Sequence, residues 1–196
     1  MDNPTSTTTK CTSVLKGLPW CQGKTVLPGI RRRAYIAAAD DIAVWPDFER
    51  DTAGRPTSAI RKGNFTLVEG SKFLVIDHLA DKAEPKSETQ GEFPSQTFNN
   101  QLTIVHPEVG PDATAAITPF LNTEVVVIIE DMYGRFRIFG SKNWPAKIAP
   151  SQELGQGATG NSATTLAVTA ADEVSMPFYE GEIPTEDGTI NEAPNG

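Results

Sequence analysis

The stretch from Val125 to Gly140, VVVIIEDMYGRFRIFG, constrains the fold more than any other part of the chain. Five consecutive β-branched apolar residues run from Val125 to Ile129, and an alternating segment, RFRIF, follows the turn residues DMYG. β-Branched residues favour strands, and a strand without polar positions is buried on both faces. The sequence therefore predicts a β-hairpin whose first strand runs through a core and whose second strand turns Phe136 and Ile138 to one face.

The size and the turn content of the chain favour one β-rich domain. The chain has 196 residues, of which 16 are glycine and 15 are proline, so turns are frequent. We expect a mainly β protein, a β-sandwich or barrel of antiparallel strands with one short flanking α-helix and long loops. The domain is expected to span residues 14–179, between a flexible N-terminal arm at 1–13 and an acidic, flexible C-terminal tail at 180–196.

Alternating apolar and polar residues predict further strands. The clearest is 97–105, in which Leu102 and Ile104 face the core and only Asn100 interrupts the inner row. The other expected strands are 34–38, 64–69 and 72–77 joined as a hairpin by Gly70-Ser71, 86–93, 146–149, 163–169 and 174–179.

One short helix is expected at residues 113–117. Asp112 is suited to cap its N-terminus, and Pro119 limits its length by kinking it or by opening a second short turn. In contrast, residues 40–63 show no regular period, and so long a loop is uncommon within a compact domain. Because the loop carries Trp45 and Phe48, we expect either a docking segment or a lid that folds back on the core.

The charge distribution disfavours a protein that grips nucleic acid. The net charge is −8, and the five acidic residues after position 179, with no Lys or Arg beside them, contribute −5 of it. Tight binding to phosphates needs a surplus of Lys and Arg on one face. The cluster Arg31-Arg32-Arg33 is the exception, and we interpret it as an interface or a solvated strand edge.

No catalytic, cofactor or metal site is expected. Residues 155–160 match G-x-G-x-x-G but precede a strand-like segment, and residues 17–25 have one residue too many for a phosphate-binding loop. The four side chains Cys11, Cys21, His78 and His106 lack the short paired spacings of zinc sites. The two cysteines would pair only in an oxidising compartment. No apolar run approaches the ~20 residues of a membrane span, so we expect a soluble protein.

Several motifs resemble a family of virion structural proteins from tailed phages, most like tail-tube proteins. They are SETQGE at 87–92, the central hairpin, FYEG at 178–181 and PGIRRRAYIAAADDIAVWP at 28–46. The resemblance implies a β-sandwich that assembles in the host cytoplasm into hexameric rings. These rings would stack into a virion tail tube, with other virion proteins as partners and DNA as non-specific passing cargo. The long acidic tail departs from the family pattern.

The resemblance also implies which residues would face the lumen and which would lie at contacts between subunits. A lumen that lets DNA slide should repel phosphates rather than bind them. The residues expected to face the lumen are Glu88, Gln90, Glu92, Asn99, Gln101 and Thr103. The residues expected at contacts between subunits are Arg31, Arg32, Arg33, Trp45 and Phe48, with the N-terminal arm as a further contact.

Other functions stay open at this point. Within the same class, the chain could be a head–tail joining protein or a capsid decoration protein. From another class, it could be a β-sandwich module that binds a glycan or a protein through Trp20, Trp45 or Trp144. An enzyme ranks third, since neither histidine lies in a recognisable catalytic setting.

Overall fold

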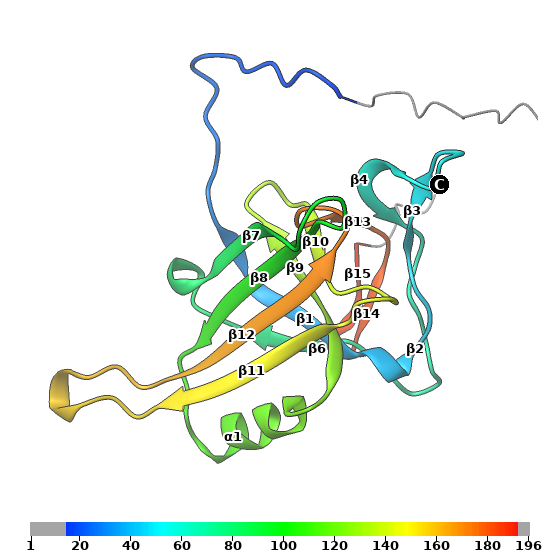
Figure 1. The fold of residues 1–196 in the computed structure, drawn as a ribbon. Helices are drawn as coiled ribbons and strands as arrows, with labels where there is room; N and C mark the ends of the chain where they lie inside the picture. The colour runs from blue at the N-terminus through cyan, green and yellow to red at the C-terminus, as the bar shows by residue number, and fades with distance from the viewer. Residues whose placement is uncertain (1–14, 192–196) are drawn as a thin grey trace, which may run out of the picture.

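The computed structural model describes residues 15–191, and its central element is the strand β9 (Glu124–Asp131). β9 turns back into β10 (Phe136–Phe139) as an antiparallel hairpin, which confirms the prediction for the central stretch (Figure 1). The β-branched run thus lies where the pattern places it, in the interior of the molecule.

β9 has neighbours on both edges, and two strands share one of these edges. β1 (Ile30–Ala38) pairs along one edge, whereas β10 and then β11 (Ala146–Glu153) pair with successive halves of the other. Gly140 lies where the chain passes from β10 toward β11, with a φ of +100°. A Cβ atom there would lie 2.8 Å from the Ala146 backbone nitrogen, so the crossing requires glycine.

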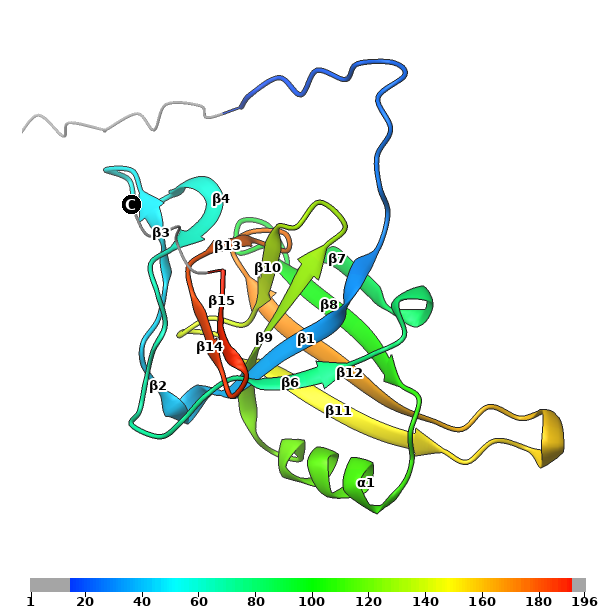
Figure 2. The same ribbon diagram turned by 180° about the vertical axis from the view of Figure 1, so that it is seen from behind.

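The shared edge divides the sheet into two continuations. One continues from β11 through β12 and β8 to β7, and we call these four strands the wing (Figure 2). The other continues from β10 through β13 and β4 to β3, while β6 joins the free edge of β1. The bounds are β3 Asp47–Arg50, β4 Pro56–Lys62, β6 Leu74–Asp77, β7 Glu84–Gln90, β8 Thr97–His106, β12 Ala163–Asp172 and β13 Phe178–Glu180.

The two faces of β9 enter different hydrophobic clusters. Val125, Val127 and Ile129 pack with β8, β11 and β12, whereas Val126 and Ile128 pack with aromatic residues on the opposite side. All five side chains are at most 1% exposed. The expectation of a strand buried on both faces is therefore confirmed. It explains why the run has no polar position.

Short elements cover the second cluster. They are β2 (Ile42–Val44), β5 (Thr66–Leu67), β14 (Ile183–Thr185) and β15 (Gly188–Ile190). The last two form a hairpin inside the predicted flexible tail, and Ile183 is fully buried. This corrects the tail prediction for residues 183–190, because apolar burial outweighs the acidic composition there. Residues 1–13 and 192–196 of the predicted arm and tail lie outside the described residues.

The helix is α1 (Pro111–Ile117), and it is as short as expected. Its N-cap residue is Gly110 rather than Asp112, because the proline at 111 occupies the first helical position. A 3-10 turn at Thr118–Phe120 contains Pro119 and follows directly, so the second of the two expected outcomes holds. Other 3-10 turns lie at Ala39–Asp41, Ala80–Lys82 and Gly157–Thr159. The fold class, mainly β with one short α-helix in the described chain, is confirmed.

The predicted hairpin of residues 64–77 is wrong. β5 pairs with β2, and β6 pairs with β1, so the two strands do not pair with each other. Phe65 directly precedes β5 and Phe73 directly precedes β6, and both are buried in the second cluster with ring centroids 5.2 Å apart. Burying both rings directs the two strands to different partners. A tight turn between two strands does not by itself show that the strands pair with each other.

Residues 40–63 also differ from expectation. The segment holds β2, β3 and β4 instead of an irregular loop, and β4 pairs in parallel with β13. β2 and β3 have only three and four residues, and β4 has a single large apolar residue, Ile60, so the segment shows almost no periodic pattern. Phe48 is 6% exposed and Trp45 is half-buried against Phe65, which corresponds to the lid alternative.

Candidate functional site

The outward face of the wing carries most of the side chains predicted to face a lumen. Glu88 lies opposite Asn99 in the β7–β8 register, and Gln101 lies beside them on the same face. Asn100, Leu102 and Ile104 alternate with this row and are each 1% exposed, which confirms the predicted alternation of β8. The list of predicted residues that share this face is Glu88, Gln90, Asn99, Gln101 and Thr103. That the face lines a lumen stays a prediction.

Glu92 does not belong to this face. β7 ends at Gln90, and Glu92 lies in the loop before β8, where its carbonyl accepts the Ser95 backbone N–H at 2.7 Å. Gly91, with a φ of +82°, ends the strand earlier than the expected boundary at Phe93. The grouping of Glu92 with the strand residues is therefore corrected.

Asn100 is polar at an inward position because three groups satisfy its side chain. Its amide donates to the Val174 carbonyl at 3.1 Å. Its Oδ1 accepts the Met176 backbone N–H at 3.0 Å and the Ser87 hydroxyl at 2.6 Å. The residue that interrupted the apolar row thus attaches the chain after β12 to the wing.

The wing face is polar, rich in small residues and weakly acidic. Hydroxyl and small residues of β12 lie next to β8, with Thr169 opposite Gln101 and Ala171 opposite Asn99. Lys86 lies 3.7 Å from the Glu88 carboxylate, which partly neutralises it. The ionisable strand residues on this face are Glu84, Glu88, Glu124, Glu153, Lys86 and Lys147. With acidic groups in excess and no arginine among them, the face is unsuited to gripping phosphates.

The two borders of the wing have open backbone edges. β7 pairs with β8 and with no other strand in residues 15–191. At the other border, β11 pairs with β9 only at Ala146 and Lys147, so the rest of that edge has no strand partner in the described chain. An open edge presents unpaired N–H and C=O groups that can bind another strand. The wing can therefore be extended on either side.

The basic cluster is largely neutralised within the chain. A register shift lies between Ile30 and Ala34 of β1, and the three arginines occupy it. Arg31 lies 2.8 Å from Glu130 and Arg33 lies 3.2 Å from Asp77, while Arg32 forms no ion pair in the described chain. Their role at a subunit contact stays a prediction, with only one guanidinium left for it.

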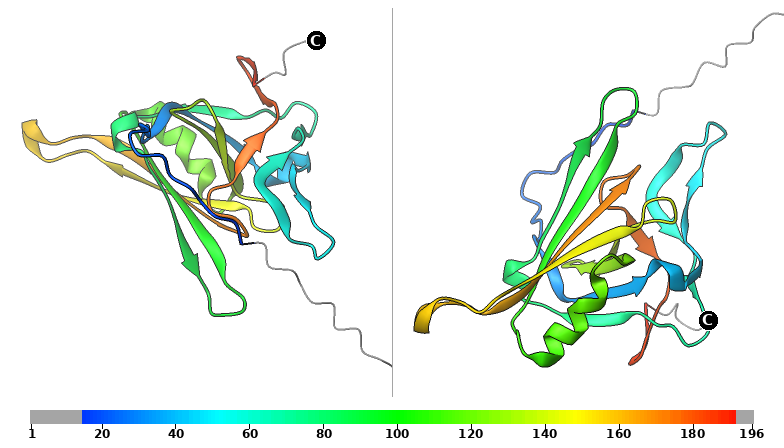
Figure 3. Two further views of the ribbon diagram at one scale, coloured as in Figure 1. Left: turned by 90° about the horizontal axis from the view of Figure 1, so that it is seen from above. Right: turned by 60° about the horizontal axis from the view of Figure 1, so that its bottom comes forward.

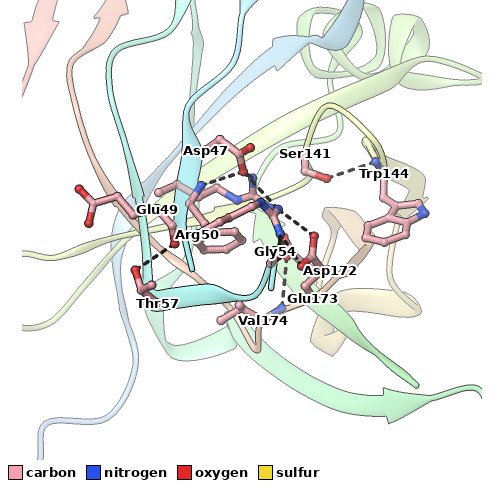
Figure 4. A network of polar contacts seen from close by, with 12 residues as sticks. Asp47, Glu49, Arg50, Gly54, Thr57, Ser141, Trp144, Asp172, Glu173 and Val174 are labelled. Atoms are coloured by element: carbon pink, nitrogen blue, oxygen red, sulfur yellow. Dashed lines mark hydrogen bonds and ion pairs between the residues drawn. The ribbon is translucent and has the colours of Figure 1, made fainter. Parts of the chain in front are cut away.

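A polar network joins β3 and β4 to the end of β12 (Figure 4). The buried Arg61 lies 3.0 Å from the Asp172 carboxylate, and its guanidinium also lies over the Phe48 ring at 4.1 Å. Burial raises the pKa of Asp172, and the attraction of Arg61 opposes that rise. Arg50 forms a bidentate pair with Glu173, with both distances 2.9 Å. This network fixes Phe48 inside its own chain, which leaves little of that side chain for a subunit contact.

Sequence reasoning missed this network. Arg61 and Asp172 are separated by 111 positions, and neither lies in a motif. The only local signal was Asp172, a charged residue at an inward position of β12. A local pattern cannot identify the distant residue that pairs with it.

Three segments project from the domain, and each has an exposed large apolar side chain. The β7–β8 and β11–β12 connections point away in different directions (Figure 3). Phe93 in the first is 88% exposed and Leu154 in the second is 81% exposed. The third is residues 15–29, all exposed, which corrects the expectation that the domain begins at residue 14. Leu18 and Trp20 there are 97% and 73% exposed.

The three tryptophans do not form one binding site. Trp45 and Trp144 line a cavity of about 100 Å³ beside Arg50 and Arg61, whereas Trp20 lies on the projecting segment. Within residues 15–191, no group of three His, Cys, Asp or Glu side chains could hold a metal ion. No helix in that range is long and apolar enough to cross a membrane.

Comparison of the chain with protein-family models, curated proteins and solved structures finds no match.

Proposed function

We propose that this protein is a non-enzymatic virion structural protein whose copies form rings, and that these rings stack into a tail tube for DNA. The observation that carries the proposal is the wing, a four-stranded sheet with open edges on both borders and a polar, weakly acidic outward face. Strand pairing between neighbours would join the wings into a closed barrel and remove those edges.

The lining of such a barrel would suit passing DNA. Asn99, Gln101 and Thr103 offer hydrogen-bonding groups without positive charge, and Glu84 and Glu88 repel phosphates. A surface rich in Lys and Arg would instead hold DNA through many phosphate contacts and slow its movement.

The projecting segments support assembly over a free monomer. Leu18, Trp20, Phe93 and Leu154 are each more than 70% exposed in the lone chain. Burying large apolar side chains contributes roughly 1.5–3 kcal/mol each, so neighbouring copies would gain stability by covering them. A head–tail joining or decoration protein would use the same surfaces, and these assemblies are the alternatives within the class.

Electron microscopy of the purified protein tests the proposal. We expect closed rings or tubes whose wall thickness matches one subunit. The competing function is a binding module that uses the cavity beside Trp45 and Trp144. A monodisperse monomer that binds a glycan array and forms no rings at any concentration would refute assembly and support that module.

The lumen is tested by adding a positive charge to the wing face. Gln101→Lys should leave ring formation intact and slow DNA release from virions that carry the variant, because each subunit adds a phosphate-binding charge. Thr189→Lys, at an exposed position of β15 outside the wing, is the matched control and should not affect release. Wild-type release from Gln101→Lys virions would remove the reason for placing this face inside a tube.

A further inference from the structure

Residues 15–27, which we call the arm, leave the domain as an exposed segment with one turn, in which the Lys24 backbone N–H donates to the Cys21 carbonyl at 3.3 Å. The Tyr133 hydroxyl attaches the arm near its end, because it accepts the Leu27 backbone N–H at 2.9 Å and lies 3.2 Å from the Thr25 carbonyl. Leu18 and Trp20 are two positions apart, so an extended chain turns both to one face. These two large apolar side chains lie in solvent in the lone chain, which is costly unless a partner covers them.

An apolar groove of about 230 Å³ lies between β6 and α1. Small and aliphatic residues form most of its lining, with Asp77, His106 and Thr164 at its polar part. The apolar lining consists of Val75, Ile76, Ala113, Ala116, Ile117 and Leu166. Small residues on the helix keep this groove open for a large side chain.

The edge of β6 that borders the groove has capacity for another strand. β6 pairs with β1 on its other edge. At its two ends, the Phe73 backbone N–H bonds to the Pro184 carbonyl, and the Asp77 carbonyl contacts the His106 ring at 2.7 Å. Since backbone groups alternate in direction along a strand, Val75 between them directs its N–H and C=O away from β1. An added strand would satisfy these groups.

The arm and the groove lie at opposite ends of the molecule. In both Figure 1 and Figure 2 the arm leaves at the top, whereas α1 lies at the bottom. Fully extended, residues 15–27 reach on the order of 40 Å, enough to cross to a neighbouring copy. A contact between the top of one copy and the bottom of the next is head-to-tail, and it repeats along a stack.

We propose that the arm of one copy binds the groove of a second copy, adding to the edge of β6 and placing Leu18 and Trp20 against α1. This inference rests on the proposed stacking of rings and names the surfaces that meet between them. Pro19 fits an added edge strand, because its ring points away from Leu18 and Trp20. A proline is tolerated in an edge strand when its missing N–H faces solvent instead of the neighbouring strand. A central tryptophan in an apolar pocket is a typical source of binding energy.

Disulfide cross-linking tests the contact. In an extended chain Lys16 shares the face of Leu18 and Trp20, whereas Cys21, like Pro19, lies on the opposite face. In a Cys11→Ser, Cys21→Ser background, Lys16→Cys places a thiol on the arm and Ala113→Cys places one in the groove. Ala115→Cys places one on the same helix at an exposed position that does not line the groove, and it serves as the matched control. Under mild oxidation we expect a ladder of covalent oligomers for Ala113→Cys and monomers for Ala115→Cys. Adding Trp20→Ala should reduce the cross-linked fraction about tenfold.

A second pair of variants requires no disulfide geometry. Ala116→Glu puts a carboxylate in the groove and should raise the concentration for half-maximal self-association at least about tenfold in sedimentation, whereas Ala115→Glu should not. Equal cross-linking of the two helix positions, or a disulfide formed only within one chain, would overturn the inference. Rings without the ladder would overturn the arm contact alone. A ladder without rings or tubes would support the contact and refute the tail-tube proposal.

Discussion

The buried pair of Arg61 and Asp172 offers a sharp test of how β3 and β4 are held to the wing. The two side chains are 7% and 1% exposed, and their closest atoms lie 3.0 Å apart. Arg61→Met keeps an unbranched apolar side chain at this position and removes the charge, together with the guanidinium that lies over the Phe48 ring. The variant therefore leaves the Asp172 carboxylate buried without its counter-ion.

The expected loss can be bounded from the ionisation of Asp172. Breaking a buried pair costs roughly 3–5 kcal/mol of unfolding free energy. Asp172 can escape part of this cost by taking up a proton. From its ordinary pKa of 3.8, protonation at pH 7 costs at most about 4.4 kcal/mol, and at pH 5 at most about 1.6 kcal/mol. We thus expect a loss of about 3–4 kcal/mol at pH 7 that shrinks by roughly 2 kcal/mol at pH 5.

Urea unfolding of the single and double variants at both pH values measures this loss. Arg61→Met with Asp172→Asn should recover to within about 1 kcal/mol of the unmodified chain, since no unpaired charge remains. Arg50→Met is the matched control in the same network. Its pair with Glu173 is one-third exposed, so we expect a loss below about 1 kcal/mol at both pH values. A pH-independent loss for Arg61→Met, or additive losses in the double variant, would refute the reasoning.

Three further predictions concern stability. His78 is 4% exposed, neither ring nitrogen has a partner in the described chain, and burial lowers its pKa below 6.5. The contribution of neutral His78 to the unfolding free energy is complete above pH 6.5 and falls by at most about 1.4 kcal/mol per pH unit below it. His78→Leu should therefore make the unfolding free energy less dependent on pH between pH 7 and pH 5. A pH profile that parallels that of the unmodified chain would contradict this. Gly140→Ala should cost about 2 kcal/mol or more in thermal unfolding, because its Cβ would meet the Ala146 nitrogen at 2.8 Å; an unchanged Tm would show that the crossing adapts. Asn100→Ala should lose about 2–3 kcal/mol by leaving the Met176 N–H and two other groups unpaired. A loss like that of Asn99→Ala, at the half-buried neighbouring position on the outward face, would reject a structural role for the amide.

Parts of the fold were readable from the sequence because their signals are local. The β-branched run and the turn at 131–134 identify the central hairpin, and alternation along 97–105 identifies the two faces of β8. Asp112 and Pro119 predict a short helix at 113–117, although the residue that caps it is Gly110. These predictions depend on side-chain shape and period, which neighbouring residues determine on their own.

The candidate site was predicted in part for the same reason. Alternation placed Asn99, Gln101 and Thr103 on one face, but it could not say that β7 ends before Glu92. The ion pairs of Arg31 and the burial of Phe48 were also invisible, since both depend on residues distant in sequence. The exposed apolar side chains of the arm, by contrast, can be recognised only from the tertiary structure, in which no part of the domain covers them.

The sequence by itself thus determined a β-rich chain built around one strand that is apolar on both faces, together with a short helix and a polar, weakly acidic strand surface. Only the tertiary structure decided that β5 and β6 have different partners, that residues 40–63 and 183–190 form strands, and that both borders of the wing are open. The physical reason is that hydrophobic period is a property of neighbouring residues. Strand pairing and the exclusion of water from a core depend instead on which distant segments compete for the same surface.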